Sequence, residues 1–249
     1  MPVIGAGNIV AARAGEADYH TDMADTDLRL VPQLGCCEQP VDVVSAFYQY
    51  LFLLPAPPAE DSATSREELA ELHNLQAQRS AAELARAKAD AAEENVFAFS
   101  TVLGPQFTAE QFPLTTRFFD RVTETEKAAL REAKDYWHRR RPYVVDPTLA
   151  PCSNGSNGSY PSGHSTLAFM DAALLAQMLP ERHDALFERA ADFAHNRLVC
   201  GVHYPSDVEA GKTLGTVLAA LLQREPALTA PMAAATSELR HAYAAAASR

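Results

Sequence analysis

The segment Asn196–Asp207 carries residue types that suit nucleophilic chemistry on a phosphoryl group. His203 and Asp207 lie four positions apart, so a carboxylate can lie beside one imidazole nitrogen. Such a carboxylate fixes the tautomer and leaves the other nitrogen free to attack. Arg197 lies across an expected turn, and its guanidinium can bind two phosphate oxygens. A single His–Asp pair is nevertheless more often structural than catalytic.

A second segment, Tyr160–His164, has the composition of an anion-binding helix start. It follows a loop rich in Gly, Asn and Ser, and Pro161 is predicted to begin a helix. The backbone N–H groups there can form an anion cradle together with the hydroxyl of Ser162. Gly163 would let an oxyanion approach the backbone closely, and His164 at the rim can deliver a proton. Taken alone, the same segment also fits an ordinary capped helix.

The basic residues concentrate in a third segment, Lys134–Pro142. Lys134 and Arg141 are seven positions apart, so on one continuous helix both side chains would project from nearly the same face. Arg139 and Arg140 would then point elsewhere, toward solvent or an acidic partner. A charge run is usually a surface feature, but three such segments together supply cations, an anion cradle and two histidines. Phosphoryl transfer needs these groups, because its transition state spreads charge over three oxygens.

The elements that position these residues are predicted to be helices. Hydrophobic residues make up 47% of the 249 residues and are largely Ala and Leu, while aromatic residues make up 8%, which favours helices over strands. We therefore predict an all-α protein with one compact multi-helix domain over residues 41–249, preceded by an irregular arm over residues 1–40. The predicted helices cover Val41–Leu54, a stretch from a capping box at Thr64–Glu67 to about Ser100, a stretch from a capping box at Thr123–Glu126 to about Arg141, Ser162–Leu179, Arg182–Val199, Pro205–Gln223 and Ala227–Ala247. The stretch that ends near Ser100 is long enough for one bent helix or two.

The charge and the cysteines exclude several classes of protein. A formal net charge of −11 argues against a nucleic-acid partner, so any phosphate site must be a local basic pocket. No run of about 20 apolar residues is present, which argues against membrane insertion. The cysteines have no metal-binding spacing, so a zinc site is not expected. Their even number permits disulfides without indicating the pairing of Cys36, Cys37, Cys152 and Cys200.

Together the three segments resemble the signature of the type 2 phosphatidic acid phosphatase superfamily. The matching patterns are Lys, six residues, Arg-Pro; then Pro-Ser-Gly-His; then Arg, five residues, His, three residues, Asp. Within that superfamily, Gly158–His164 and Val199–His203 resemble the bacterial class A non-specific acid phosphatases. One departure is Asn196, which stands where the third pattern usually has Ser.

The resemblance implies the acid phosphatase/vanadium haloperoxidase fold and a metal-independent acid phosphatase of broad specificity. Such an enzyme uses no cofactor, acts on small phosphate monoesters and can transfer the phosphoryl group to other alcohols. It also implies a periplasmic location, with a signal peptide already removed, and a homo-oligomer as one outcome. An acidic pH optimum is expected.

The resemblance also implies a role for each residue of the signature. His203 is the nucleophile that forms a phosphohistidine, Asp207 orients it, and His164 is the general acid. The residues that bind the phosphate are Lys134, Arg141, Ser162, Gly163 and Arg197.

Three other functions fit parts of the pattern. A vanadium-dependent haloperoxidase would bind vanadate in the same oxyanion pocket. A lipid phosphate phosphatase would need the membrane helices that the sequence lacks. A non-catalytic phosphate-binding protein would need neither His164 nor the His203–Asp207 pair. The sequence does not identify the leaving group, for which the candidate lining residues are Tyr136, Trp137, Tyr160, Tyr204 and the N-terminal arm.

Overall fold

The computed structural model of the protein describes residues 53–155 and 157–247. These residues form α-helices and short 3-10 turns and contain no strand, so the all-α prediction is confirmed. The arm predicted over residues 1–40 and most of the helix predicted over Val41–Leu54 lie outside the described residues. Within the described part, no helix combines the length and the apolar character that a membrane crossing requires.

The helices follow one another with short connections. Their bounds are Ala63–Gln78 (α3), Ala81–Ala92 (α4), Val96–Phe99 (η2), Ser100–Leu103 (α5), Pro113–Trp137 (α6), Pro142–Val145 (α7), Gly163–Met178 (α8), Pro180–Arg182 (η3), His183–Val199 (α9), Pro205–Leu222 (α10) and Pro226–Ala247 (α11). The four helices predicted from Ser162 onward are confirmed to within one residue at each end.

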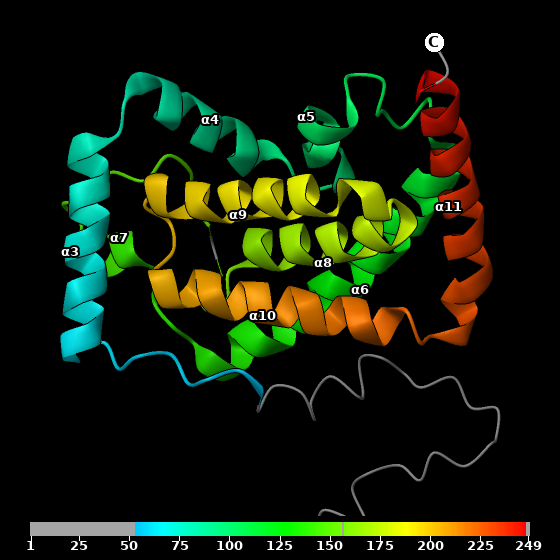
Figure 1. Ribbon diagram of the computed structural model, residues 1–249. Helices are drawn as coiled ribbons and strands as arrows, with labels where there is room; N and C mark the ends of the chain where they lie inside the picture. The colour runs from blue at the N-terminus through cyan, green and yellow to red at the C-terminus, as the bar shows by residue number, and fades with distance from the viewer. Residues whose placement is uncertain (1–52, 156, 248–249) are drawn as a thin grey trace, which may run out of the picture. The chain divides into compact units, whose positions relative to one another are not determined.

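Helix α8 lies between α9 and α10 (Figure 1). Eleven of its 16 side chains are buried, as expected of a helix that is apolar around most of its circumference. A Cβ on Gly211 of α10 would lie 2.5 Å from the carbonyl oxygen of Ser162, so only glycine permits this close approach. The contact joins the starts of the two helices, and the N–H of Ser162 donates to the carbonyl of Asp207 at 3.0 Å.

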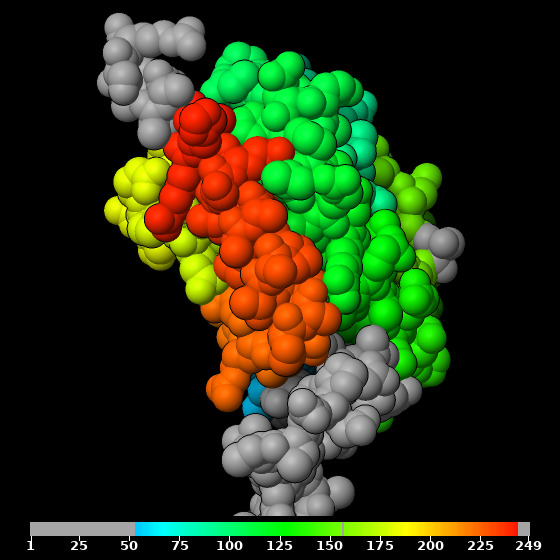
Figure 2. Space-filling view, turned by 90° about the vertical axis from the view of Figure 1, so that its right-hand side faces the viewer, coloured from blue at the N-terminus to red at the C-terminus, as the bar shows by residue number. Residues whose placement is uncertain are grey.

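Helix α6 begins earlier than predicted because its cap comes from a distant helix. Figure 2 shows α11, in orange and red, lying along the green segments that include α6. The carboxylate of Glu238 on α11 accepts the N–H groups of Leu114 and Thr115 at 3.1 and 2.8 Å. The helix therefore begins at Pro113, and the capping box predicted at Thr123–Glu126 is wrong, since both of its end residues are buried in mid-helix.

The capping box predicted at Thr64–Glu67 is also wrong. The N-cap of α3 is Ser62, whose side chain accepts a first-turn N–H. A true capping box joins Ser80 and Glu83 and starts α4, so the stretch predicted to reach Ser100 contains two long helices. The spacing hydroxyl–x–x–Glu also occurs inside helices, and local sequence alone does not identify which copy forms a helix start.

A disulfide joins Cys152 to Cys200, a pairing that the sequence left open. The two Cα atoms are 4.8 Å apart, and the bond closes a loop of 48 residues. It ties the loop that precedes α8 to the residue that caps the C-terminus of α9. Cys36 and Cys37 lie outside the described residues.

Candidate active site

Six of the eight predicted site residues line one cavity of about 450 Å³. The cavity is bounded by α4, α6, α8 and α9 and by the loop after Cys152. The six residues are Lys134, Arg141, Gly163, His164, Arg197 and His203. The other two, Ser162 and Asp207, are fully buried beside it.

Lys134 and Arg141 reach the cavity from different elements, so the prediction that they share one helix is wrong. Helix α6 ends at Trp137, and His138 after it has a left-handed backbone with φ 48°. Arg141 is extended, with ψ 151°, as favoured for a residue before a proline. The Lys134 ammonium donates to the carbonyl of Gly158 at 2.6 Å.

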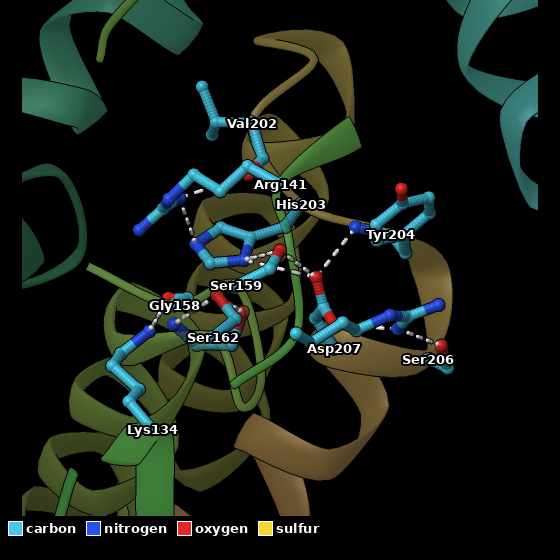
Figure 3. Close-up of polar contacts among 12 residues, drawn as sticks. Lys134, Arg141, Gly158, Ser159, Ser162, Val202, His203, Tyr204, Ser206 and Asp207 are labelled. Atoms are coloured by element: carbon cyan, nitrogen blue, oxygen red, sulfur yellow. Dashed lines mark hydrogen bonds and ion pairs between the residues drawn. The ribbon is translucent and has the colours of Figure 1, made fainter. Parts of the chain in front are cut away.

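His203 lies between a carboxylate and a guanidinium (Figure 3). Its Nδ1 is 3.3 Å from Oδ2 of Asp207, and its Nε2 is 3.1 Å from Nη1 of Arg141. Because a guanidinium only donates hydrogen bonds, Nε2 is the acceptor and Nδ1 carries the proton. Burial lowers the pKa of His203, although the hydrogen bond to Asp207 opposes that shift. The imidazole is therefore neutral, with a lone pair on Nε2.

Asp207 is held by more donors than the sequence indicated. Besides His203, its carboxylate accepts hydrogen bonds from the hydroxyl of Ser159, from the N–H of Tyr204 at 2.9 Å and from Arg139 at 2.6 Å. Burial alone would raise the pKa of Asp207, but His203, Arg139 and Ser159 outweigh it and lower the pKa to about 2. Asp207 is thus a fixed negative charge beside His203.

Arg139 was placed outside the site by the sequence, yet it contacts Asp207 directly. Its second Nη is 2.8 Å from a carboxylate oxygen of Glu68, and its guanidinium lies 3.9 Å from the ring centre of Tyr204. Burial opposes its charge, but Asp207 and Glu68 raise the pKa of Arg139. Glu68 comes from α3, far away in sequence, and no motif marks it. The Arg139–Asp207 contact makes Arg139 a candidate positioning residue.

We expect Arg139→Gln to lower kcat/KM by on the order of 10²-fold, because Asp207 and with it His203 lose a fixed neighbour. Removing a cation also raises the pKa of His203, so the acid limb of the pH profile should move to higher pH. The matched control is Arg140→Gln, since Arg140 pairs with Glu60 on the exposed surface. If kcat/KM falls but its pH dependence at low pH is unchanged, the role of Arg139 is only structural.

Three buried cations, Lys134, Arg141 and Arg197, line the cavity, and none of them forms an ion pair with a carboxylate of the described residues. The guanidinium of Arg197 has two buried nitrogens, Nε and Nη1, with no hydrogen-bond partner among the described residues. Burial and then Arg141 lower the pKa of Arg197 to about 10. Burial and Arg141 likewise lower the pKa of Lys134 to about 7. Unpaired buried donors of this kind are costly unless an anion binds them.

His164 stands in the first turn of α8, at the wall of the cavity. Its ring stacks on Phe193 with centroids 5.7 Å apart, and its Nε2 is 3.3 Å from the carbonyl of Ala91. Burial and then the charge of Arg197 lower the pKa of His164 to about 3. This histidine is therefore neutral near pH 7, and a negative charge bound beside it would favour its protonation.

Ser162 serves first as the N-cap of α8. Its hydroxyl oxygen accepts from the N–H of Ser165 at 3.4 Å and from the Ser165 hydroxyl at 2.9 Å. The helix accordingly begins at Gly163, one residue after the start of the predicted span Ser162–Leu179. A phosphate contact of the Ser162 hydroxyl stays a prediction.

Asn196, the departure from the third pattern, anchors α9 beside the site. Its amide nitrogen donates to the carboxylate of Asp90 on α4 at 2.7 Å. Asp90 also accepts two hydrogen bonds from Arg189, at 3.0 and 2.6 Å. Asn196 therefore fixes the turn of α9 that carries Arg197.

The comparisons of sequence with known proteins agree in one family. The model of the PAP2 superfamily matches residues 124–226. A non-specific acid phosphatase of Salmonella typhimurium is 33% identical over 197 residues, which cover 76% of this chain and 79% of that protein. A non-specific acid phosphatase of Providencia stuartii is 31% identical, covering 71% and 75%. A bacterial vanadium-dependent iodoperoxidase has a similar fold, with a TM-score of 0.53 at 19% identity over 70% of this chain and 52% of that one.

Proposed function

We propose that this chain, which belongs to the PAP2 superfamily and within it to the non-specific acid phosphatases, hydrolyses phosphate monoesters through a covalent phosphohistidine on His203. Its acid phosphatase activity follows from that membership. The proposal adds the chemical route and its independence of metal ions. The observation that carries it is the Nε2 lone pair of His203, held beside three buried cations.

Substrate binding places the phosphoryl group among Lys134, Arg141 and Arg197. The unpartnered nitrogens of Arg197 gain phosphate oxygens as acceptors, and the start of α8 at Gly163 supplies backbone N–H groups. Arg141 must move its hydrogen bond from Nε2 of His203 to a phosphate oxygen. That exchange frees the lone pair when the phosphorus atom arrives.

In the first chemical step, a bond forms between Nε2 of His203 and phosphorus while the bond from phosphorus to the leaving oxygen breaks. His164 gives its proton to the leaving alkoxide, and Asp207 stabilises the charge that develops on the His203 ring. In the second step, neutral His164 takes a proton from water, whose oxygen attacks phosphorus. The P–N bond then breaks, and inorganic phosphate leaves. An alcohol in place of water gives phosphotransfer.

The bound substrate itself favours the protonated form of His164. Arg197 and burial hold the pKa of His164 at about 3 in the free enzyme. A bound phosphate dianion compensates the charge of Arg197 and raises that pKa, since a nearby opposite charge favours the protonated imidazole. Protonation is thereby coupled to substrate binding.

We expect kcat/KM to be highest in acid and to fall as the pH rises through about 7. Lys134, with a pKa of about 7, carries its charge below that pH and loses it above, whereas His203 stays neutral in moderate acid because its pKa is lowered. The measurement is p-nitrophenyl phosphate hydrolysis from about pH 4 to 9, since kcat/KM reports groups of the free enzyme. Lys134→Arg should move the alkaline limb to higher pH, because arginine keeps its charge.

The same assay with excess EDTA tests metal independence. Undiminished activity is expected, and a loss that added divalent metal restores would contradict the proposed route. If the fall in kcat/KM at high pH occurs at the same pH in Lys134→Arg as in the wild type, that fall arises from a group other than Lys134.

A vanadium haloperoxidase remains the alternative that shares this fold. The similarity to the iodoperoxidase establishes the fold alone. Iodide oxidation by peroxide after vanadate loading, in the absence of phosphatase activity, would favour that alternative.

The proposal includes a periplasmic location. The Cys152–Cys200 disulfide supports it, because such bonds persist mainly in oxidising compartments.

A further inference from the structure

The cavity extends well past the phosphate-binding residues along helix α6. Lys134, Leu130, Glu126 and Thr123 all line it and follow one another at spacings of three or four residues. Lys134 and Glu126 are eight positions apart, which corresponds to about 12 Å along the helix axis. The end of the cavity away from Lys134, Arg141 and Arg197 is therefore available to the leaving group of a substrate.

The residues that line the cavity change from apolar to charged along helix α6. Leu130, Leu167 and Ala91 line the cavity beside the phosphate end, and a Cβ on Gly163 would lie 3.1 Å from the Leu130 side chain. Beyond them, Glu94 and Glu126 contribute carboxylates. None of the aromatic side chains that the sequence offered for this role lines the cavity. Lys127 and Arg131 line the cavity as well, so a leaving group meets an apolar stretch first and groups of both charges after it.

Glu126 is a buried acid with an unused hydrogen-bonding capacity. Its side chain is 3% exposed, and its Oε1 has no hydrogen-bond partner among the described residues. A buried polar atom without a partner is costly, and a ligand that supplies a hydrogen bond would remove that cost. The position of Glu126 in the cavity wall makes the leaving group the natural source of that bond.

The charged groups around Glu126 come from three segments. Asp171 on α8 is fully buried, and neither of its carboxylate oxygens has a partner in the described part of the chain. Lys127 and Lys134 on α6 favour an ionised Glu126, and Glu94 opposes it. Burial first, and then Asp171, raise the pKa of Glu126 well above its usual range. Glu126 is therefore a neutral carboxylic acid at acidic pH, able both to donate and to accept.

We propose that Glu126 forms a leaving-group subsite that selects phosphate monoesters of hydroxylated alcohols, in which an apolar stretch separates the phosphate from a distal hydroxyl. The inference rests on the proposed function, because the subsite acts on the leaving group of that same reaction. A hydroxyl matches a neutral carboxyl, since each can donate one hydrogen bond and accept another. An ammonium group would instead require Glu126 to ionise beside Asp171.

The test compares three series of primary alkyl phosphates, from ethyl to octyl, that end in a methyl, a hydroxyl or an amino group. In the wild-type enzyme we expect kcat/KM of the hydroxyl series to exceed that of the methyl series by about 3- to 10-fold at one optimal chain length. Glu126→Leu should abolish this ratio. Glu126→Gln should retain it, because glutamine is neutral and still donates and accepts.

The ratio of two substrates within one variant does not depend on how much of that variant is folded. Glu124→Leu is the matched control, since Glu124 lies on the same helix with a 75% exposed side chain that pairs with Lys127. Its ratio should equal that of the wild type. A preference for the amino series that Glu126→Gln removes would overturn the hydroxyl assignment.

Equal rates for all three series in the wild type, with p-nitrophenyl phosphate still hydrolysed, would overturn the subsite and leave the proposed function standing. Failure to hydrolyse p-nitrophenyl phosphate as well would overturn the proposed function and the subsite with it.

Discussion

Replacing His203 with alanine is expected to lower kcat for p-nitrophenyl phosphate by a factor on the order of 10⁴ or more, since the proposed covalent route passes through its Nε2. His203 is 2% exposed, and its ring has polar contacts with Arg141, Asp207 and the hydroxyl of Ser159. The matched control is His195→Ala, because His195 is an exposed histidine on the same helix as Arg197 and lies outside the cavity. That control should keep nearly full activity.

Trapping the covalent intermediate distinguishes the proposed roles of His164 and His203. With p-nitrophenyl phosphate the leaving group needs little protonation, so His164→Ala should still form the phosphoenzyme but hydrolyse it slowly. Rapid quenching with labelled substrate should then trap an acid-labile, base-stable phosphate on His164→Ala and none on His203→Ala. Label retained on His203→Ala would contradict the assignment of the nucleophile.

Replacing Arg197 with methionine is expected to change activity and stability in opposite directions. Arg197 is 4% exposed, and two nitrogens of its guanidinium have no hydrogen-bond partner among the described residues. The charge of Arg141 disfavours the charge of Arg197. Loss of this cation removes stabilisation of the transition-state charge and should lower kcat/KM by roughly 10²- to 10³-fold. A methionine of similar length needs no partner, so the free energy of unfolding should rise by about 1 kcal/mol.

The expected rise in the free energy of unfolding follows from the pKa of Arg197. Folding lowers this pKa from 12.5 to about 10, so the folded state disfavours the charged form, and the charge opposes folding at every pH below about 10. Removing the charge relieves that cost throughout the working range. Unfolding by guanidinium chloride near pH 6 measures the change in the free energy of unfolding.

Inorganic phosphate provides the control for this second prediction. It should raise the Tm of the wild type, because it binds only the folded enzyme, and should raise the Tm of Arg197→Met much less. Arg189→Met is the matched substitution, since Arg189 donates two hydrogen bonds to Asp90. Replacing it should lower the free energy of unfolding of the protein. A less stable Arg197→Met protein would show that its guanidinium is satisfied in the folded state.

The sequence by itself was sufficient for the fold class and for the second half of the chain. Each of the helices α8, α9, α10 and α11 has its boundary signals within a few residues, as with Ser162 before α8 and Pro205 at the start of α10. The residues of the three patterns were equally readable, because each is defined by type and spacing along the chain. Six of them line one cavity.

Only the tertiary structure decided the features that depend on distant partners. The start of α6 is capped by Glu238 from α11, and Asp207 is held by Arg139, itself paired with Glu68 from α3. The disulfide and the unpartnered carboxyl of Glu126 also arise where separate segments meet. Short-range signals such as caps and helical periodicity act within one or two turns, whereas burial and ion pairing depend on the packing of whole helices. For that reason the sequence indicated candidate residues for the chemistry, and packing determined which others hold them in place.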